Sequence, residues 1–255
     1  MIGAIIGDIA GSIYEWNPTK TKDFPLLPEK CFFTDDTVLT AAIAESIVTN
    51  NSYLESVRTI GARYPNSGYG GSFRDWLYSP VTEPYNSWGN GSAMRVSPVG
   101  FAFNTTEDVL REAKNTSIIT HDHPEGIKGA QATALAVFLA RTGHSKEAIR
   151  AEIQNKFKYD LDRTVDHVRP NYRFDVSCQG TVPEALIAFL DSSSYEDTIR
   201  NAISLGGDAD TLACIAGGIA EAFYGDISKD LIRKAKSFLT SDIIEITDEF
   251  YKTYC

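Results

Sequence analysis

The stretch GGDADTLACIAGGIAEAFY spans residues 206–224, and its part from Thr211 to Tyr224 is typical of a buried helix rich in small residues. A second segment of the same kind, GAQATALAVFLA, covers residues 129–140. Further segments with helical periodicity are 39–47, 149–157, 228–239 and 242–251. Strict alternation of apolar and polar residues, the pattern of a half-buried strand, is scarce. The sequence therefore predicts an all-α fold.

Four residues near the N-terminus recur at a spacing of four, namely Gly3, Gly7, Gly11 and Glu15. On a helix they would share one face. Three glycines on that face would let another backbone approach closely, and Glu15 would emerge at the end of the stripe. Two interpretations stay open at this point: a tight helix crossing with an exposed glutamate, or a glutamate presented to a functional site.

Two stretches interrupt the helical pattern, at residues 65–98 and 158–183. The first is rich in Pro, Gly, Asn and Ser, and both are longer than most connections between helices. We expect both to be irregular. Loops of this length tend to carry function or to be disordered. The aromatic residues of the first stretch argue against disorder; they are Tyr69, Phe73, Trp76, Tyr85 and Trp88.

Length and composition favour one ordinary globular domain. The chain has 255 residues, near the upper limit for a single hydrophobic core, so we expect one domain over residues 1–255, acting as a monomer. The formal net charge is -10. Affinity for nucleic acid depends mainly on Lys and Arg, so a nucleic-acid target is not expected. An acidic chain is compatible with a protein that gathers metal cations.

The cysteines are widely scattered and form no CxxC pair, so neither a disulfide framework nor a zinc site is expected, and a reducing cytoplasm is the expected location. They are Cys31, Cys178, Cys214 and Cys255. The apolar N-terminal segment lacks a basic region and contains Asp8, which does not fit a signal peptide. No uninterrupted apolar stretch of about 18 residues occurs, so no transmembrane helix is expected.

Residues 33–37 read FTDDT and precede a helical pattern. Thr34 is a candidate N-cap, which would place Asp35 and Asp36 in the first helical turn. One interpretation is purely structural, because acidic residues at a helix start complement the helix dipole. The other is that these side chains bind a cation.

Residues 206–211, GGDADT, repeat this arrangement at the start of another predicted helix. Asp208, Asp210 and Thr211 again supply two carboxylates and a hydroxyl, although they too could simply cap a helix. Hard cations such as Mg²⁺ and Mn²⁺ prefer oxygen ligands. Together, the two motifs could hold two metal ions, an arrangement that can clamp a substrate oxygen.

Two further segments could bind a substrate. Ser87–Gly91 reads SWGNG, whose glycines could offer backbone N–H groups to a phosphate and whose Trp88 could stack on a base. It could equally be a surface turn with one buried tryptophan. Residues 120–124 read THDHP. Because no cysteine or third histidine lies nearby, zinc is disfavoured, and His121 is interpreted as a structural or substrate-contacting residue.

The chain resembles the ADP-ribosylglycohydrolases over nearly its whole length. Five segments carry the resemblance, in the family's order: GAIIGDIAGSIYE (3–15), FTDDT (33–37), SWGNGSAMRV (87–96), THDHPEG (120–126) and GGDADT (206–211). Each motif is weakly specific by itself, whereas five in order are strongly specific. The opening segment looks closer to the branch that includes serine-linked ADP-ribose hydrolases than to the arginine-linked branch.

The resemblance implies an orthogonal bundle of helices with a cleft that binds two Mg²⁺ ions, for which Mn²⁺ could substitute. The positions that match the metal ligands are Thr34, Asp35, Asp36, Asp208, Asp210 and Thr211. Glu15 matches the glutamate that either coordinates metal or acts on the scissile bond. With Asp35 and Asp36, it makes up the expected catalytic group.

The resemblance also implies where ADP-ribose binds. Ser87, Trp88, Gly89 and Asn90 match the loop that binds the diphosphate and stacks on adenine, and Gly70, Gly71 and His121 match further contacts. The implied activity is hydrolysis of the C1″ glycosidic bond of ADP-ribose in a modified protein or other target, through an oxocarbenium-like transition state. Two alternatives stay open: a non-catalytic module that binds ADP-ribose or a nucleotide, and a hydrolase of free ADP-ribose esters.

Overall fold

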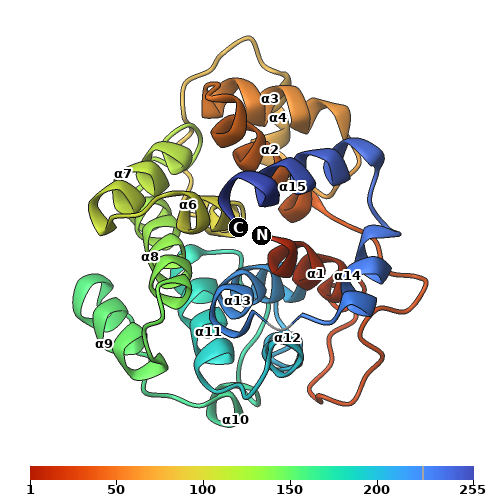
Figure 1. Ribbon diagram of the computed structural model, residues 1–255, viewed down its shortest axis with the longest axis vertical. Helices are drawn as coiled ribbons and strands as arrows, with labels where there is room; N and C mark the ends of the chain where they lie inside the picture. Colours follow the sequence, from red (N-terminus) through yellow and green to blue (C-terminus); the bar gives the residue numbers. More distant parts are fainter. Residues whose placement is uncertain (226) are drawn as a thin grey trace.

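The computed structural model describes residues 1–225 and 227–255, and within them it is all-α, as predicted (Figure 1). The helices are α1 (Ile2–Gly11), α2 (Asp35–Thr49), α3 (Tyr53–Arg63), α4 (Gly71–Tyr78), α5 (Gly91–Met94), α6 (Ser97–Ala102), α7 (Thr106–Ser117), α8 (Pro124–Arg141), α9 (Lys146–Phe157), α10 (Val165–Val168), α11 (Cys178–Leu190), α12 (Tyr195–Ser204), α13 (Ala209–Tyr224), α14 (Lys229–Lys236) and α15 (Ser241–Tyr254). The described residues contain no strand; a single antiparallel bridge joins Gly89 and Ser177. None of these helices is long and apolar enough to span a membrane.

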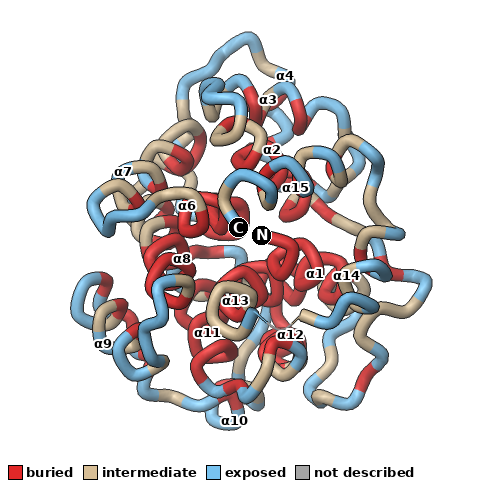
Figure 2. Tube along the Cα trace, in the orientation of Figure 1, coloured by how far each residue is buried: buried red, intermediate tan, exposed pale blue. Residues whose placement is uncertain are grey.

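Helix α13 lies at the centre of the bundle, with α1, α8, α11 and α12 around it (Figure 1). These inner helices are buried along most of their length, whereas α9, α10 and α14 lie at the surface (Figure 2). One cluster of buried apolar side chains runs from Met1 to Phe250. The two apolar segments that the sequence singled out, 129–140 and 211–224, are the cores of α8 and α13.

The glycines of α1 allow it to lie directly against α13. A Cβ atom on Gly7 would overlap the carbonyl group of Ala213, and one on Gly11 would overlap the backbone of Asp210. The predicted close backbone approach is therefore confirmed. The helix nevertheless ends at Gly11, so the expectation that Glu15 continues its face is wrong: Glu15 lies in the turn that follows.

Both stretches expected to be irregular contain helices. Within 65–98, α4 buries Phe73, Trp76 and Leu77, whose spacing is that of one helical face. Within 158–183, α11 begins at Cys178 with Ser177 as its N-cap, and it includes Pro183. These helices were not predicted because the glycines and prolines in both stretches lower the local helix propensity. Packing in the fold stabilises such helices where local propensity does not.

Candidate active site

A cavity of about 580 Å³ opens between the starts of α2 and α13, the turn after α1, and the loops before α4 and α5. Every site residue proposed from the sequence lines it except Trp88: Glu15, Thr34, Asp35, Asp36, Gly70, Gly71, Ser87, Gly89, Asn90, His121, Asp208, Asp210 and Thr211. Segments almost 200 residues apart in the sequence therefore meet in one place. The volume is in the usual range for a small-molecule site.

Carboxylates of the cavity, together with Asp8, which does not line it, form two groups that share one member. Asp8, Asp36 and Asp210 bring carboxylate oxygens within 4.8 Å of one another, and Glu15, Asp208 and Asp210 do the same. Asp35 also lines the cavity, next to Gly68. Asp210 belongs to both groups, so the arrangement offers two adjacent clusters of oxygen donors.

Local backbone geometry explains how the two helix starts present these side chains. Thr34 is the N-cap of α2, as predicted: its backbone is extended and its hydroxyl accepts a hydrogen bond from the Asp36 N–H at 3.3 Å. At α13 the outcome differs. Asp208 occupies the N-cap position but makes no capping bond, and its carboxylate instead accepts from Asn90 Nδ2 at 2.7 Å. The hydroxyl of Thr211 donates to Asp36 Oδ2 at 3.3 Å, which joins the two helix starts.

Asp8 is a site residue that sequence reasoning missed. It is fully buried in the otherwise apolar α1. Its carboxylate accepts from the backbone N–H of Thr34 at 2.9 Å, from the Thr34 hydroxyl at 2.7 Å and from the Thr37 N–H at 3.1 Å, and also from the Thr37 hydroxyl. The available signal was one charged residue within an apolar segment, since a buried carboxylate needs partners of this kind.

Burial and mutual repulsion make the carboxylates of the cavity poor acids. Burial raises the pKa of Asp35, Asp36 and Asp210 well above the ordinary value, and neighbouring carboxylates raise it further. Burial is also the main cause that raises the pKa of Asp208 to about 6 and that of Glu15 to about 7. Such a cluster is costly unless protons or cations neutralise it.

The donor set fits divalent cations. Asp36 Oδ1 is buried and has no hydrogen-bond partner among the described residues, so it is an acceptor left free. All the candidate ligands are carboxylate or hydroxyl oxygens, the donors that Mg²⁺ and Mn²⁺ prefer. The structure therefore contains acidic clusters that could hold metal ions.

The loop before α5 forms a further part of the cavity wall, and its Asn90 contacts Asp208. Main-chain hydrogen bonds fix this loop to the segment before α11: the N–H of Asn90 donates to the carbonyl of Val176 at 2.8 Å, and that of Cys178 to the carbonyl of Trp88 at 2.9 Å. A Cβ on Gly91 would lie 3.1 Å from His121 Nε2, so a glycine lets this ring approach the loop.

Two buried basic side chains line this part of the cavity. Burial, together with the nearby Arg95 charge, lowers the pKa of His121 well below its usual range, so the imidazole is neutral at neutral pH. Arg95 is the only Arg or Lys that lines the cavity among the residues described. Its Nη2 donates to the carbonyl of Thr116 at 2.7 Å and to the Thr120 hydroxyl at 2.9 Å. Arg95 was not selected from the sequence.

Trp88 is the one proposed site residue that the structure does not bring to the cavity. Its side chain does not line the cavity wall, and because it is 48% exposed the structural alternative of a buried tryptophan is wrong. Six other aromatic residues line the cavity among those described, namely Trp16, Phe32, Phe33, Phe73, Tyr85 and Phe174. Tyr85 lies beside His121, with ring centroids 6.0 Å apart.

The known proteins to which the chain is similar are ADP-ribosylglycohydrolases and related hydrolases. A family model described as ADP-ribosylglycohydrolase matches residues 1–254. ADP-ribosylhydrolase ARH3 of Mus musculus is 26% identical, and the match covers 96% of this chain and 88% of that protein. ADP-ribosylarginine hydrolase Tri1 of Pseudomonas putida (strain GB-1) is 24% identical over 88% of this chain and 69% of its own length. A solved structure of an "ADP-ribosylglycohydrolase-related protein complex" aligns with a TM-score of 0.75 at 25% identity, covering 100% of this chain and 97% of that one.

Proposed function

The chain belongs to the ADP-ribosylglycohydrolase family, and on that premise we propose that it is a Mg²⁺-dependent hydrolase that cleaves the C1″ glycosidic bond of ADP-ribose in a modified protein or other target. The enzyme class, a glycosidase-type hydrolase, follows from the family. One observation carries the proposal: two groups of carboxylates share Asp210, which lines the cavity, and Glu15 belongs to one of them.

Two metal ions would be held by the oxygen donors at the starts of α2 and α13. The ligands we propose are Thr34, Asp35, Asp36, Asp208, Asp210 and Thr211. When bound, Mg²⁺ supplies positive charge that orients the ribose hydroxyls and polarises bound oxygen atoms, and Mn²⁺ would satisfy the same donors. Asp8 supports this set, because it holds the Thr34 backbone and hydroxyl in place.

Glu15 is the residue we propose to move the proton. A carboxyl oxygen of Glu15 lies within 4.8 Å of carboxylate oxygens of Asp208 and Asp210, so Glu15 is a proton carrier beside the proposed metal ligands. Cleavage breaks the bond between C1″ and the acceptor atom, while water supplies a hydroxyl to C1″ and a proton to the acceptor. Glu15 can take the proton from the attacking water or deliver one to the departing atom.

The remainder of ADP-ribose would lie along the loop before α5. Ser87, Gly89 and Asn90 would contact the diphosphate, with Gly70, Gly71 and His121 as further contacts, and Arg95 would supply the nearest positive charge. Tyr85 replaces Trp88 as the aromatic residue placed to stack on adenine, because Tyr85 lines the cavity and Trp88 does not.

The experiment that tests this function compares wild type with Glu15→Gln. The substrates are peptides carrying ADP-ribose on Arg, Ser or Glu, ADP-ribosylated nucleic acid, and small ADP-ribose esters, each with and without Mg²⁺. We expect turnover of at least one substrate, lost in EDTA. Glu15→Gln should lower kcat by a factor of about 10² or more, while the Kd for ADP-ribose changes by less than about tenfold.

Each outcome assigns the protein to one class. Turnover of esters alone would identify a hydrolase of free ADP-ribose esters. Tight binding of ADP-ribose without turnover of any substrate would make the protein a binding module. An unchanged kcat in Glu15→Gln would leave Glu15 without a catalytic role.

A further inference from the structure

Several of the large apolar side chains exposed on this protein border the mouth of the cavity. Trp16 is 79% exposed, Phe32 53%, Val176 47% and Phe174 45%, and all four line the cavity. Exposed apolar side chains that gather at one place, and not singly over the surface, mark an interaction site. We call Trp16 and Phe174 the aromatic rim.

The centre of the rim is a contact between two segments that are distant in sequence. The rings of Trp16 and Phe174 stack with centroids 5.3 Å apart and planes inclined at 29°. Trp16 lies in the turn after α1, and Phe174 lies between α10 and α11. The stacked pair leaves much of both rings open to solvent and to the cavity, so it offers a flat apolar surface.

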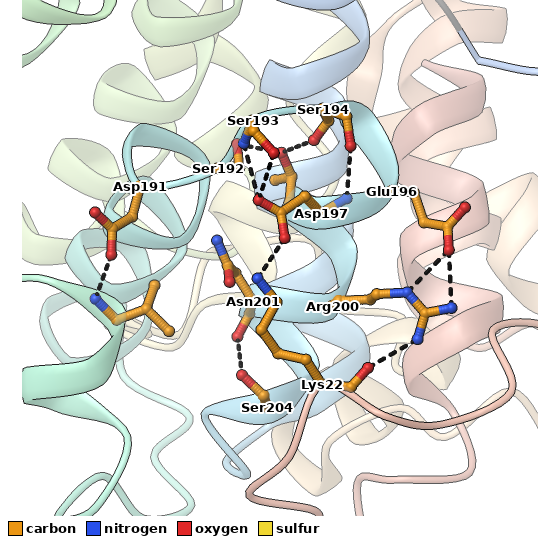
Figure 3. Close-up of polar contacts among 12 residues, drawn as sticks. Lys22, Asp191, Ser192, Ser193, Ser194, Glu196, Asp197, Arg200, Asn201 and Ser204 are labelled. Carbon is orange, nitrogen blue, oxygen red and sulfur yellow. Dashed lines mark hydrogen bonds and ion pairs between the residues drawn. The ribbon is translucent and has the colours of Figure 1, made fainter.

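Polar contacts hold the rim segments in place before any ligand binds. Lys20 Nζ donates to the carbonyls of Arg169 at 2.9 Å and of Tyr172 at 2.8 Å, which joins the turn after α1 to the segment that carries Phe174. The same turn is fixed to α12, where Lys22 pairs with Asp197 and Arg200 donates to the Lys22 carbonyl at 2.8 Å (Figure 3). A surface held in this way loses little entropy when a partner binds.

The position of the rim identifies which part of a substrate it can touch. Trp16 directly follows Glu15, whose carboxylate groups with Asp208 and Asp210. The scissile bond must lie near these carboxylates if the proposed function holds. The aromatic residue proposed for adenine, Tyr85, lies instead beside His121. The rim therefore borders the metal end of the cavity, where the acceptor of ADP-ribose leaves.

We propose that the aromatic rim is an acceptor subsite that recognises a large apolar or aromatic side chain next to the modified residue of an ADP-ribosylated polypeptide. This inference rests on the proposed function. A neighbouring residue in an extended chain lies about 3.5 Å along from the modified one, so its side chain can reach the rim while ADP-ribose fills the cavity. A polypeptide is favoured over a nucleic acid, because the chain carries a net charge of -10.

The test uses two peptides that carry ADP-ribose in the same linkage, and this linkage is one that wild type turns over. The peptides differ only in the residue beside the modified one, which is Tyr in one peptide and Gly in the other. The measured quantity is the ratio of kcat/KM for the Tyr peptide to that for the Gly peptide. We expect a ratio of about ten in wild type, the effect of one aromatic contact of about 1.4 kcal/mol. Trp16→Ala and Phe174→Ala should each bring the ratio close to one. Tyr78→Ala is the matched control, since Tyr78 is 54% exposed but does not line the cavity, and it should leave the ratio unchanged.

Two results would overturn the subsite. A wild-type ratio near one would show that the rim does not recognise the neighbouring side chain. Equal losses on both peptides in Trp16→Ala, with the ratio preserved, would show that Trp16 only positions Glu15. If wild type cleaves no substrate, the proposed catalysis fails. The Tyr and Gly peptides are then made with ADP-ribose on serine, and the ratio is taken from their Kd values. A ratio near one, or no binding of either peptide, would reject the subsite there as well.

Discussion

The carboxylate cluster makes a specific prediction about how stability depends on pH and Mg²⁺. Asp208 illustrates the sign. Its pKa rises from an ordinary 3.8 to about 6 in the folded protein, so the folded state binds more protons than the unfolded state between these values. The stability that Asp208 contributes is complete below pH 3.8 and is lost as the pH rises through about 6.

The magnitude follows from the same shift. At pH 5 a carboxyl with a pKa of about 6 is roughly nine-tenths protonated when folded, whereas its unfolded form is ionised. Raising the pH from 5 to 8 should therefore cost the metal-free protein on the order of 1 kcal/mol through Asp208, or roughly 2–4 °C in Tm for a chain of this size. Asp35, Asp36 and Asp210, whose pKa values are also raised, act in the same direction.

The assay is thermal unfolding of the metal-stripped protein at pH 5, 6, 7 and 8, in EDTA and in excess Mg²⁺. The gain in Tm from Mg²⁺ should grow with pH, because ions replace protons on the carboxylates, and a ligand at 100 times its Kd stabilises by about 2.7 kcal/mol. The buried His121, with its lowered pKa, destabilises the fold below about pH 6.5. It does so equally with and without Mg²⁺, so the difference between the two curves isolates the carboxylates.

Asp208→Asn is the matched control, since it removes one charge at nearly constant volume. It should raise the Tm of the metal-free protein at pH 8 and reduce the gain from Mg²⁺. The reasoning is refuted if Mg²⁺ raises Tm by the same amount at pH 5 as at pH 8, or if Asp208→Asn lowers the metal-free Tm at pH 8.

Further predictions concern packing and ligand binding. Gly7→Ala should lower the free energy of unfolding by about 3 kcal/mol or more, because the added methyl group would overlap the Ala213 carbonyl. Gly70→Ala is the control, since the space around Gly70 is open, and it should change the free energy of unfolding by less than about 0.5 kcal/mol. Chemical denaturation measures both. Tyr85→Ala should weaken ADP-ribose binding by about 1–3 kcal/mol in calorimetry, and Trp88→Ala by less than about 0.5 kcal/mol. A larger effect at Trp88 than at Tyr85 would return the adenine contact to Trp88.

Features set by local sequence could be predicted. The helical class, the two apolar helices inside α8 and α13, and the N-cap role of Thr34 all depend on residues a few positions apart. The two acidic motifs could be chosen because each is a local pattern at a helix start. That they face each other depends on the packing of α1, α2 and α13, which no local pattern reports.

Features set by tertiary contacts could not be predicted from local patterns. Trp88 was expected to stack on adenine because of its residue type and its glycine-rich surroundings; that contact stays a prediction, but its side chain does not line the cavity wall. Tyr85, three positions earlier, lines the cavity instead. Arg95 and Phe174 were overlooked for the same reason, since their neighbours in space come from other segments.

Asp8 shows how one short helix positions both halves of the site. The glycine face of α1 packs on α13 at Gly7 and Gly11, and Gly11 meets the backbone of Asp210 itself. Asp8 lies on a different face, about 100° around the helix from Gly7, and binds Thr34 and Thr37 at the start of α2. Any shift of α1 would therefore move Asp36 and Asp210 relative to each other. The segment GDIAG, residues 7–11, which looked from its spacing like a stripe leading to Glu15, is thus better explained as the element that sets the spacing between the two carboxylate groups.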